Sequence, residues 1–267
     1  MRTFAGKTLL ITGASEGIGK ALALELAAEG ANLVLLARNA ARLEASVREC
    51  RARGAQAEAV AGDVTRREDC ERSVARALQR FGGLDALVNN AGVTMWARFD
   101  AVHDFSVYER LLAINYLGAV HMTAAALPHL KAARGLIVAI ASMAGLTGVP
   151  ERTGYAASKH AMVGFFESLR IELAGSGVDV CVVAPDFVVT ETHKRAMGPD
   201  GQPLGESPMQ QTKIMTAADC AARIIRGIEK RERLVLMTAR GRLGRWLKLV
   251  APSMIDRIAA KAIRDRK

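Results

Sequence analysis

The sequence has few cysteines and no long uninterrupted apolar run. Its four cysteines, Cys50, Cys70, Cys181 and Cys220, are scattered and form no C-x-x-C pair, which argues against a disulfide framework and a zinc site. No apolar run reaches the ~18 residues of a transmembrane helix, and the N-terminal run is too short for a signal peptide. We therefore expect a cytoplasmic protein with no metal site.

Positive charge is in excess, but only near the C-terminus. The net charge is +10; residues 230–267 hold 12 Lys or Arg against 3 Asp or Glu, and the remaining residues hold 25 against 24. The body of the protein is thus close to neutral, and it carries no recognised nucleic-acid-binding motif. We expect no nucleic acid partner, and an anionic surface as a candidate partner of the tail alone.

Short apolar runs alternate with stretches of helical pattern along the chain. These runs are continuous, as in strands covered on both faces, and they occupy residues 7–12, 31–38, 57–64, 84–91, 135–142, 178–186 and 233–237. The helical stretches are 17–29, 40–53, 67–81, 104–130, 153–174 and 216–230. This alternation predicts an α/β fold, a doubly wound (Rossmann) sheet of seven parallel strands flanked by helices.

The same pattern predicts how the chain is divided. We expect a single domain over residues 1–240 and a basic amphipathic helical tail over 241–267. Residues 190–213 form a long irregular piece rich in glycine and proline. A connection of that length is typical of a lid, a binding loop or a disordered segment.

A glycine-rich turn follows the first predicted strand and opens a helix. It reads T-G-A-S-E-G-I-G over residues 12–19. Gly13 permits a tight turn, Gly17 leaves room for a pyrophosphate, and Gly19 permits close packing of the helix on the sheet. The helix N-terminus offers N–H groups and its positive dipole end to phosphate. The turn, with Ser15 and Ile18, is a predicted dinucleotide site; the alternative is a glycine-rich turn without a ligand.

The end of the second predicted strand indicates which dinucleotide binds. A carboxylate there would bond the ribose 2′-hydroxyl of NAD, but the strand ends Leu36-Ala37-Arg38-Asn39. The guanidinium of Arg38 suits a 2′-phosphate. The sequence therefore predicts a preference for NADP(H) over NAD(H), with an ordinary surface arginine as the alternative.

From this point the motifs resemble those of the short-chain dehydrogenase/reductase family over about residues 5–237. They are the T-G-x-x-x-G-x-G turn, Asp63-Val64, the N-N-A-G motif with Asn90, Ala91 and Gly92, then Asn115, Ser142, Tyr155-x-x-x-Lys159, and Pro185 with Val188 and Thr190. The resemblance implies hydride transfer between nicotinamide and a carbonyl or hydroxyl group. It also implies that Asn115, Ser142, Tyr155 and Lys159 are catalytic and that the other motif residues, with Tyr155 and Lys159, bind the cofactor.

Tyr155 and Lys159 are four residues apart, so they share one face of a predicted helix. A nearby ammonium favours phenolate and lowers the pKa of tyrosine from about 10. By resemblance to the family, Tyr155 is the proton donor, Ser142 holds the substrate oxygen, Lys159 also grips the nicotinamide ribose, and Asn115 anchors a water relay. The alternative is that these are ordinary core and cap residues.

One position departs from the family pattern. Asp186 stands where the family usually has the glycine of P-G-x-V-x-T, which puts the backbone angles of this loop in question. The predicted substrate walls are residues 144–153, 95–99 and 187–213, with Met95, Trp96, Met143, Leu146 and Val149 as apolar candidates and Arg98 and Arg152 as the basic residues. We expect a hydrophobic ketone or alcohol, such as a steroid, sphingoid or other lipid.

The tail has apolar residues at helical spacing. They are Leu243, Trp246, Leu247 and Val250 before Pro252, and Ile255, Ile258, Ala259 and Ala262 after it. Such a basic helix either lies peripherally on an anionic membrane or covers the protein's own core or a dimer interface. By analogy with the family, we also expect a homodimer or homotetramer formed through the helices at 104–130 and 153–174.

Two other functions remain open at this stage. One is a cofactor-binding regulator without redox activity, against which the intact set of four catalytic residues argues. The other is membrane or nucleic acid binding through the basic tail.

Overall fold

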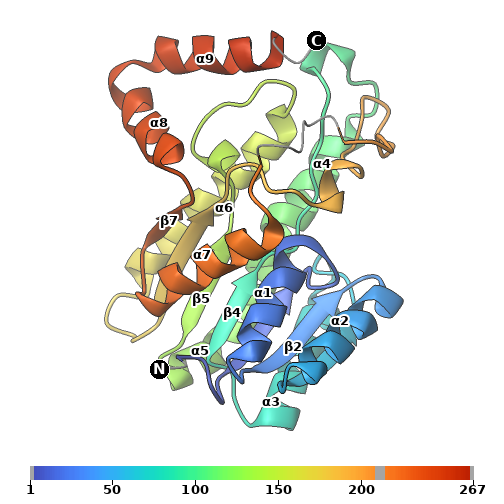
Figure 1. Cartoon of the computed structure of the whole chain (residues 1–267), viewed down its shortest axis with the longest axis vertical. Coiled ribbons are helices and arrows are strands. Elements are labelled where there is room, and N and C mark those ends of the chain that lie inside the picture. Colours follow the sequence, from blue (N-terminus) through green and yellow to red (C-terminus); the bar gives the residue numbers. More distant parts are fainter. Residues whose placement is uncertain (1–2, 208–213, 265–267) are drawn as a thin grey trace.

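The computed structural model describes residues 3–207 and 214–264, and within these ranges seven parallel strands form one sheet (Figure 1). The order across the sheet is β3-β2-β1-β4-β5-β6-β7. The strands are β1 (Thr8–Thr12), β2 (Asn32–Ala37), β3 (Gln56–Ala61), β4 (Ala86–Asn89), β5 (Leu136–Ile140), β6 (Asp179–Ala184) and β7 (Leu234–Leu236). The order reverses between β1 and β4, and a doubly wound sheet binds ligands at such a switch point.

Helices cover both faces of the sheet. They are α1 (Gly17–Ala28), α2 (Ala40–Ala52), α3 (Arg67–Phe81), α4 (Ser106–Leu112), α5 (Gly118–Ala133), α6 (Thr153–Glu172), α7 (Ala217–Glu229), α8 (Ala239–Val250) and α9 (Pro252–Arg264). Short turns η1 (Phe99–Ala101), η3 (Met143–Gly145) and η4 (Glu191–His193) lie between them. One face carries α1, α2 and α7, and the other carries α3, α5 and α6.

The continuous apolar strands explain why two cores form. Side chains alternate along a strand, so Leu9 and Ile11 of β1 pack into the core under α1 and α7, while Leu10 packs into the core under α3 and α5. All three are fully buried. A half-polar strand would leave one of these faces in water. The predicted doubly wound sheet is therefore confirmed.

Six of the seven strands end one to three residues before the predicted apolar runs do. β3 ends at Ala61 and β5 ends at Ile140, so Asp63 and Ser142 lie in the loops beyond them. Both side chains hold their loops: Asp63 Oδ1 accepts from the backbone and the hydroxyl of Thr65, each at 2.9 Å, and Ser142 Oγ accepts from Ala144 N at 3.1 Å.

The helix predicted over 104–130 runs over Ser106–Ala133 and contains a π-helical stretch, η2 (Ala113–Leu117). Its length and composition would suffice to cross a membrane. It lies instead along the sheet, where Met122, Ala126 and Leu130 are buried in the core under α3 and α6. These buried apolar residues therefore serve packing within the domain.

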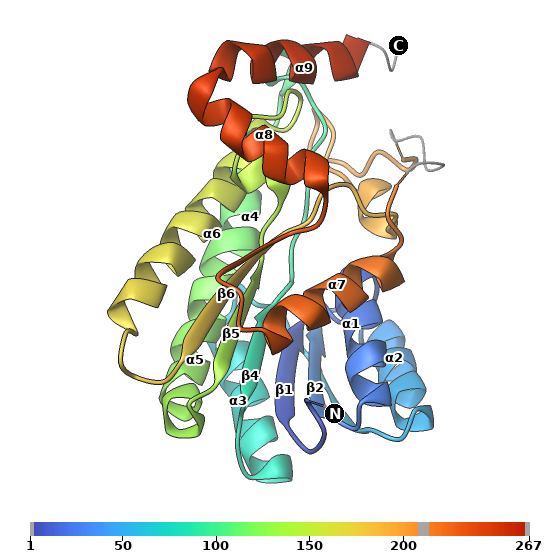
Figure 2. The ribbon, with the colours of Figure 1, turned by 60° about the vertical axis from the view of Figure 1, so that its left-hand side comes forward.

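The tail forms α8 and α9, which pack against each other beyond the carboxyl ends of the strands (Figure 2). Thr238 begins α8, because its Oγ1 accepts from Gly241 N at 3.0 Å. Lys248 Nζ donates to the Leu146 carbonyl at 2.7 Å and ties α8 to the loop before α6. Residues 208–213 of the predicted 190–213 loop and residues 265–267 of the tail lie outside the described residues, and the division at residue 240 stays a prediction.

Candidate active site

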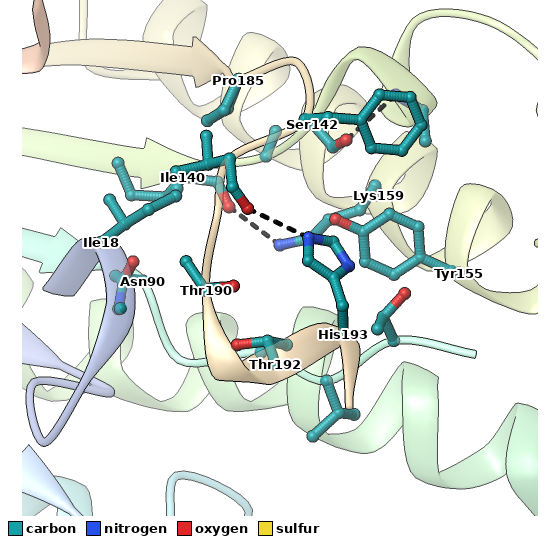
Figure 3. A pocket seen from close by; sticks show the side chains of 18 of the residues that line it. Ile18, Asn90, Ile140, Ser142, Tyr155, Lys159, Pro185, Thr190, Thr192 and His193 are labelled. Carbon is teal, nitrogen blue, oxygen red and sulfur yellow. Dashed lines mark hydrogen bonds between the residues drawn. The ribbon is translucent and has the colours of Figure 1, made fainter. Parts of the chain in front are cut away.

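A cavity of about 910 Å³ opens at the carboxyl ends of the strands. Its lining comes from the glycine turn before α1, the loops after β2, β4, β5 and β6, the start of α6, and the tail helices α8 and α9. Figure 3 shows Ile18 and Asn90 at one side of this cavity and Tyr155 and Lys159 at another, with Thr190 and His193 between them. The cavity therefore spans the predicted dinucleotide site and the predicted catalytic residues.

The glycine turn has the conformation that its sequence requires. Gly13 and Gly17 have φ of 66° and 57°, which residues with a Cβ rarely adopt. A Cβ on Gly19 would lie 2.5 Å from the Gly13 carbonyl oxygen, so only glycine fits where α1 meets the turn. Gly19 itself does not line the cavity, as expected for a residue that serves helix packing.

The β4 loop locks this turn in place. Thr12 Oγ1 accepts from the backbone N–H groups of Asn90 and Ala91, each at 2.9 Å. Asn90 Nδ2 in turn donates to the carbonyl oxygens of Thr12 at 2.9 Å and Gly13 at 3.1 Å. The side chain of Asn90 thus fixes the shape of the turn, in which Gly13 and Gly17 line the cavity.

The residues present fit a nicotinamide dinucleotide. Ser15, Gly17 and Ile18 line the cavity at the start of α1, where the helix dipole favours a pyrophosphate. The Thr190 methyl group lies 3.4 Å from where a Cβ on Gly17 would be, so the loop after β6 reaches over the turn. A side chain at Gly17 would fill the space that a pyrophosphate needs.

Basic residues gather at the adenosine end of the cavity. Arg38 and Arg42 both line it, together with Gly62, Asp63 and Val64. Arg38 Nη1 lies 3.9 Å from Asp63 Oδ2. Arg42 pairs at 3.1 Å with Glu16 of the glycine turn, and Glu16 also pairs with Arg195. This end of the cavity therefore presents more than one guanidinium.

Tyr155 and Lys159 lie on the first turns of α6 and face the cavity (Figure 3). Lys159 is buried, its Nζ donates to the Ile140 carbonyl at 2.8 Å, and it lies 6.0 Å from the centre of the Tyr155 ring. Burial opposes ionisation of the phenol, but the charges of Lys159 and Arg152 and the Ser142 hydroxyl outweigh it and lower the pKa of Tyr155. Burial disfavours the charged ammonium and therefore lowers the pKa of Lys159.

Ser142 and Asn115 have different positions. Ser142 caps η3 and lines the cavity beside Tyr155. Asn115 is fully buried and does not line it. Its Nδ2 donates to Val93 O and Ser158 Oγ, and its Oδ1 accepts from Val93 N, at 2.8 to 2.9 Å. The side chain of Asn115 therefore fixes the β4 loop and α6, within a π-helical turn of the kind that often marks functional sites.

The cavity brings most of the predicted site residues together. Its lining includes Gly13, Ser15, Gly17, Ile18, Arg38, Asp63, Val64, Asn90, Ala91, Gly92, Ser142, Tyr155, Lys159, Pro185, Val188 and Thr190, and it leaves out Gly19 and Asn115. Val188 is buried, and its carbonyl accepts from His193 Nε2 at 3.1 Å.

Only some of the residues predicted for the substrate walls line the cavity. Trp96, Met143 and Val149 line the cavity, whereas Met95 and Leu146 do not. Met95 instead packs in a small separate core with Met197. Arg98 lies outside the cavity, where it pairs with Asp100 at 2.6 Å.

The backbone at Asp186 does not have the left-handed angles that would require a glycine. Among the residues that the structure describes, the non-glycine residues with positive φ are Arg134, Glu151 and Arg231, so Asp186 needs no glycine-like angles. Its Oδ1 accepts from Phe187 N at 2.9 Å and stabilises the loop. Asp186 lines the cavity as a loop carboxylate.

Several residues that the fold brings to the site were predicted only as members of the substrate walls 144–153 and 187–213, or were not predicted for the site at all. Arg152, Phe187 and His193 line the cavity, and Gly241, Leu243, Gly244, Leu247, Ile255, Ile258 and Ala259 reach it from the tail. The sequence held one indication for Arg152, which lies three positions before Tyr155 at the start of the same predicted helix. The tail residues had only their helical spacing, which does not say what they cover.

Comparison with known proteins identifies the family. The family profile described as short chain dehydrogenase matches residues 7–198. An Arabidopsis thaliana protein named 11-beta-hydroxysteroid dehydrogenase-like 4A is 39% identical over 251 residues, covering 94% of this chain and 82% of that protein. A Dictyostelium discoideum protein named dehydrogenase/reductase SDR family protein 7-like is 32% identical, covering 97% of this chain and 82% of that protein.

A solved structure agrees with these matches. The crystal structure of a short chain dehydrogenase/reductase from Burkholderia phymatum in complex with NAD superposes with a TM-score of 0.83 at 27% identity, covering 95% of this chain and 96% of that one. The chain therefore belongs to the short-chain dehydrogenase/reductase family, whose members are oxidoreductases of hydroxyl and carbonyl groups that bind a nicotinamide cofactor.

Proposed function

We propose that this protein is an NADP(H)-dependent oxidoreductase that interconverts a hydroxyl and a carbonyl group on a hydrophobic, steroid-like or lipid-like substrate. The observation that carries the proposal is the common cavity of the glycine turn, Tyr155 and Lys159. A cofactor bound along the turn reaches the same space as the phenol. The named relatives are steroid dehydrogenases by their names, which supports this class of substrate.

The residues divide the chemistry among them. A bound nicotinamide supplies or accepts the hydride. Tyr155 donates a proton to the substrate oxygen during reduction and takes it back during oxidation, and its lowered pKa suits both directions. Ser142 would hold the same oxygen by a hydrogen bond, and Lys159 would stabilise the phenolate and bind the nicotinamide ribose. Because the Asn115 side chain is engaged by Val93 and Ser158, we place its role in the water relay on the π-helical backbone around it.

The preference for NADP(H) rests on Arg38 and Arg42. Both line the adenosine end of the cavity, where a 2′-phosphate would meet a guanidinium fork. Asp63 lies at the same end, but its Oδ1 is used by Thr65. Glu16 lines the cavity here as well and pairs with Arg42 and Arg195. Three guanidiniums against two carboxylates leave an excess of positive charge, which favours the phosphorylated cofactor.

The hydrophobic substrate is supported by the far end of the cavity. Its lining there is mainly apolar, from Trp96, Met143, Val149, Phe187, Leu247, Ile255 and Ile258. A polar substrate would leave this surface without a partner, whereas a flat lipid-like skeleton buries it. The tail residues in this set make the tail the roof of the substrate site.

A second face of the tail supports a peripheral membrane location, and we propose this as the setting of a cytoplasmic enzyme. Trp246, Leu249 and Val250 are 70%, 71% and 78% exposed, and Arg242 and Arg245 are exposed on the same helix. A tryptophan and leucines flanked by arginines suit an anionic bilayer surface. The roof of the cavity would then lie next to the source of a lipid substrate.

The long helices support a homodimer or homotetramer. Leu112 and Leu117 are 39% and 43% exposed on the helix over Ser106–Ala133. We propose that this helix and α6 form the interface, and light scattering of the purified protein tests it. A monomer at micromolar concentration would contradict this assignment.

The enzyme assay is a panel of steroid, sphingoid and aliphatic ketones, each tested with NADPH and with NADH. We expect oxidation of NADPH with hydrophobic ketones and none with small charged keto acids. A protein that binds NADPH but reduces no member of the panel would support the regulator instead. Steep salt-sensitive DNA affinity would support nucleic acid binding.

The membrane proposal needs its own test. Flotation with vesicles of phosphatidylserine and phosphatidylcholine should recover the wild-type protein, and Trp246→Ser should weaken this recovery severalfold. Ile171→Ser is the matched control, because Ile171 is 73% exposed on α6, away from the tail. Equal recovery of all three proteins, or none of the wild type, would refute a membrane contact of the tail.

A further inference from the structure

Arg152 is an unusually placed charge. It directly precedes α6 and is only 5% exposed, although arginine is rarely buried to this degree. Its guanidinium carbon lies 4.3 Å from the centre of the Tyr155 ring, 5.1 Å from that of Trp96 and 5.9 Å from that of Phe187. A guanidinium over aromatic rings is held by cation–π attraction, which is stronger where water is excluded.

Further contacts hold this guanidinium. Arg152 Nη2 donates to Thr94 Oγ1, and Trp96 Nε1 donates to Glu151 Oε2 at 2.8 Å. Glu151 has φ of 64°, a left-handed conformation that carries strain in a residue with a side chain. Its carbonyl also accepts from Ala97 N at 2.8 Å. The strained turn before α6 is thus fixed on both sides, and this aims Arg152 at Tyr155.

We propose that Arg152 is a positioning residue for the reaction: its guanidinium orients the phenol of Tyr155 in the cavity and supplies a second positive charge, beside Lys159, when the phenol gives up its proton. This inference rests on the proposed function of Tyr155. A phenolate ring is richer in electrons than a phenol, so a cation over the ring favours the ionised form. The Lys159 ammonium lies 6.0 Å from the same ring centre and has the larger of the two charge effects on the pKa of Tyr155.

Several other charged or titratable groups lie around this site. Lys159 lies on α6 and Arg152 directly precedes this helix. The loop after β5 contributes the Ser142 hydroxyl, the loop after β6 contributes Asp186, and η4 contributes His193. Glu151 is hydrogen-bonded to Trp96, and Tyr108 of α4 packs in the small core that Tyr155 borders. Of these, Lys159, Arg152 and Ser142 favour the phenolate and lower the pKa of Tyr155 against its burial.

The direction of the effect follows from the charge. Removing Arg152 raises the pKa of Tyr155, because a stabilising cation is lost and burial remains. In alcohol oxidation the phenolate is the base, so activity rises with pH through this pKa. The rising limb of the profile should therefore move to higher pH by about one unit, the lower end of the shift that one nearby charge produces.

The test compares Arg152→Met and Arg152→Lys with wild type. The kinetic constants kcat and KM are measured for alcohol oxidation across neutral and alkaline pH, and the affinity for NADP+ is measured by fluorescence. For Arg152→Met we expect the shifted limb, kcat about tenfold lower at neutral pH, and KM and NADP+ affinity within about threefold of wild type. Arg152→Lys keeps the charge but not the planar guanidinium. For this variant we expect the rising limb of the pH profile to lie between those of wild type and Arg152→Met.

A second readout does not need turnover. Ultraviolet difference titration of each Arg152 variant against the same variant carrying Tyr155→Phe isolates the Tyr155 phenolate, and it should show the same shift. Arg98→Met is the matched control, because Arg98 is exposed and paired with Asp100 outside the cavity. Its limb should coincide with that of wild type. His193→Asn shows whether any part of the pH profile comes from titration of the His193 imidazole rather than of Tyr155.

The outcomes separate the roles that Arg152 can have. An unchanged limb with a lower melting temperature would make it merely structural and overturn the proposal. So would a raised KM for anionic substrates with unchanged kcat and pH profile, because Arg152 would then bind substrate. If Arg152→Met does not fold, Arg152→Gln, which is polar but uncharged, takes its place: a rising limb shifted to higher pH supports the proposal, and a wild-type limb refutes it. Inactivity of the wild type would reject the proposed function itself, while the phenol titration would still report on Arg152.

Discussion

Replacing Arg38 by alanine tests the choice of cofactor most directly. Arg38 lines the adenosine end of the cavity, and its side chain is 66% exposed. A hydrogen bond to a charged partner contributes about 1.5–3 kcal/mol, and exposure to water places this one at the lower end. Since 1.4 kcal/mol corresponds to a factor of ten, Arg38→Ala should weaken NADPH binding about tenfold. NADH, without the 2′-phosphate, should bind about as before.

The assay is a fluorescence titration of each variant with NADPH and with NADH. Arg42 lines the same end of the cavity, so the double variant Arg38→Ala/Arg42→Ala should lose about a hundredfold if the two contributions add. Arg48→Ala is the control, because Arg48 is exposed on α2 outside the cavity. An equal loss for both dinucleotides, or no loss for NADPH, would refute the assignment of these arginines to the 2′-phosphate.

Three further outcomes follow from the site. Tyr155→Phe should lower kcat by about a hundredfold or more while NADPH still binds; near wild-type turnover would remove Tyr155 from the chemistry. Gly19→Ala should abolish cofactor binding and lower the melting temperature, since its Cβ would lie 2.5 Å from the Gly13 carbonyl oxygen, whereas Gly164→Ala, with open space around it, should do neither. The buried cysteines, whose pKa values burial raises to about 11 or 12, should resist thiol reagents at neutral pH until the protein unfolds; rapid native labelling would contradict their burial.

The local parts of the fold and site could be predicted from the sequence. Continuous apolar runs predict strands buried on both faces, and this holds for Leu9 and Leu10, which face opposite cores. Glycines at fixed spacing predict the turn because the backbone at Gly13 and Gly17 needs positive φ. Helical spacing predicts that Tyr155 and Lys159 share a face. Each of these rules acts over a few residues, so one sequence is enough to read it.

Features that join distant segments could not be predicted in the same way. The rings over Arg152 come from the loop after β4, from α6 and from the loop after β6. No spacing rule connects Trp96 to Phe187. The side chain of Asn115 likewise binds Val93 and Ser158, 22 and 43 residues away, so its structural role appears only once the chain is folded.

The tail shows most clearly where the sequence alone becomes ambiguous. Its helical spacing left a membrane surface, the protein's own core and a dimer interface as alternatives, each of them a single partner for one apolar stripe. In the structure the apolar residues of α8 divide: Leu247 is half-buried over the cavity, while Trp246 and Val250 are 70% and 78% exposed. An apolar arc wider than one stripe can pack inward and outward at once. The covering of the cavity and an outward contact are therefore compatible in one helix.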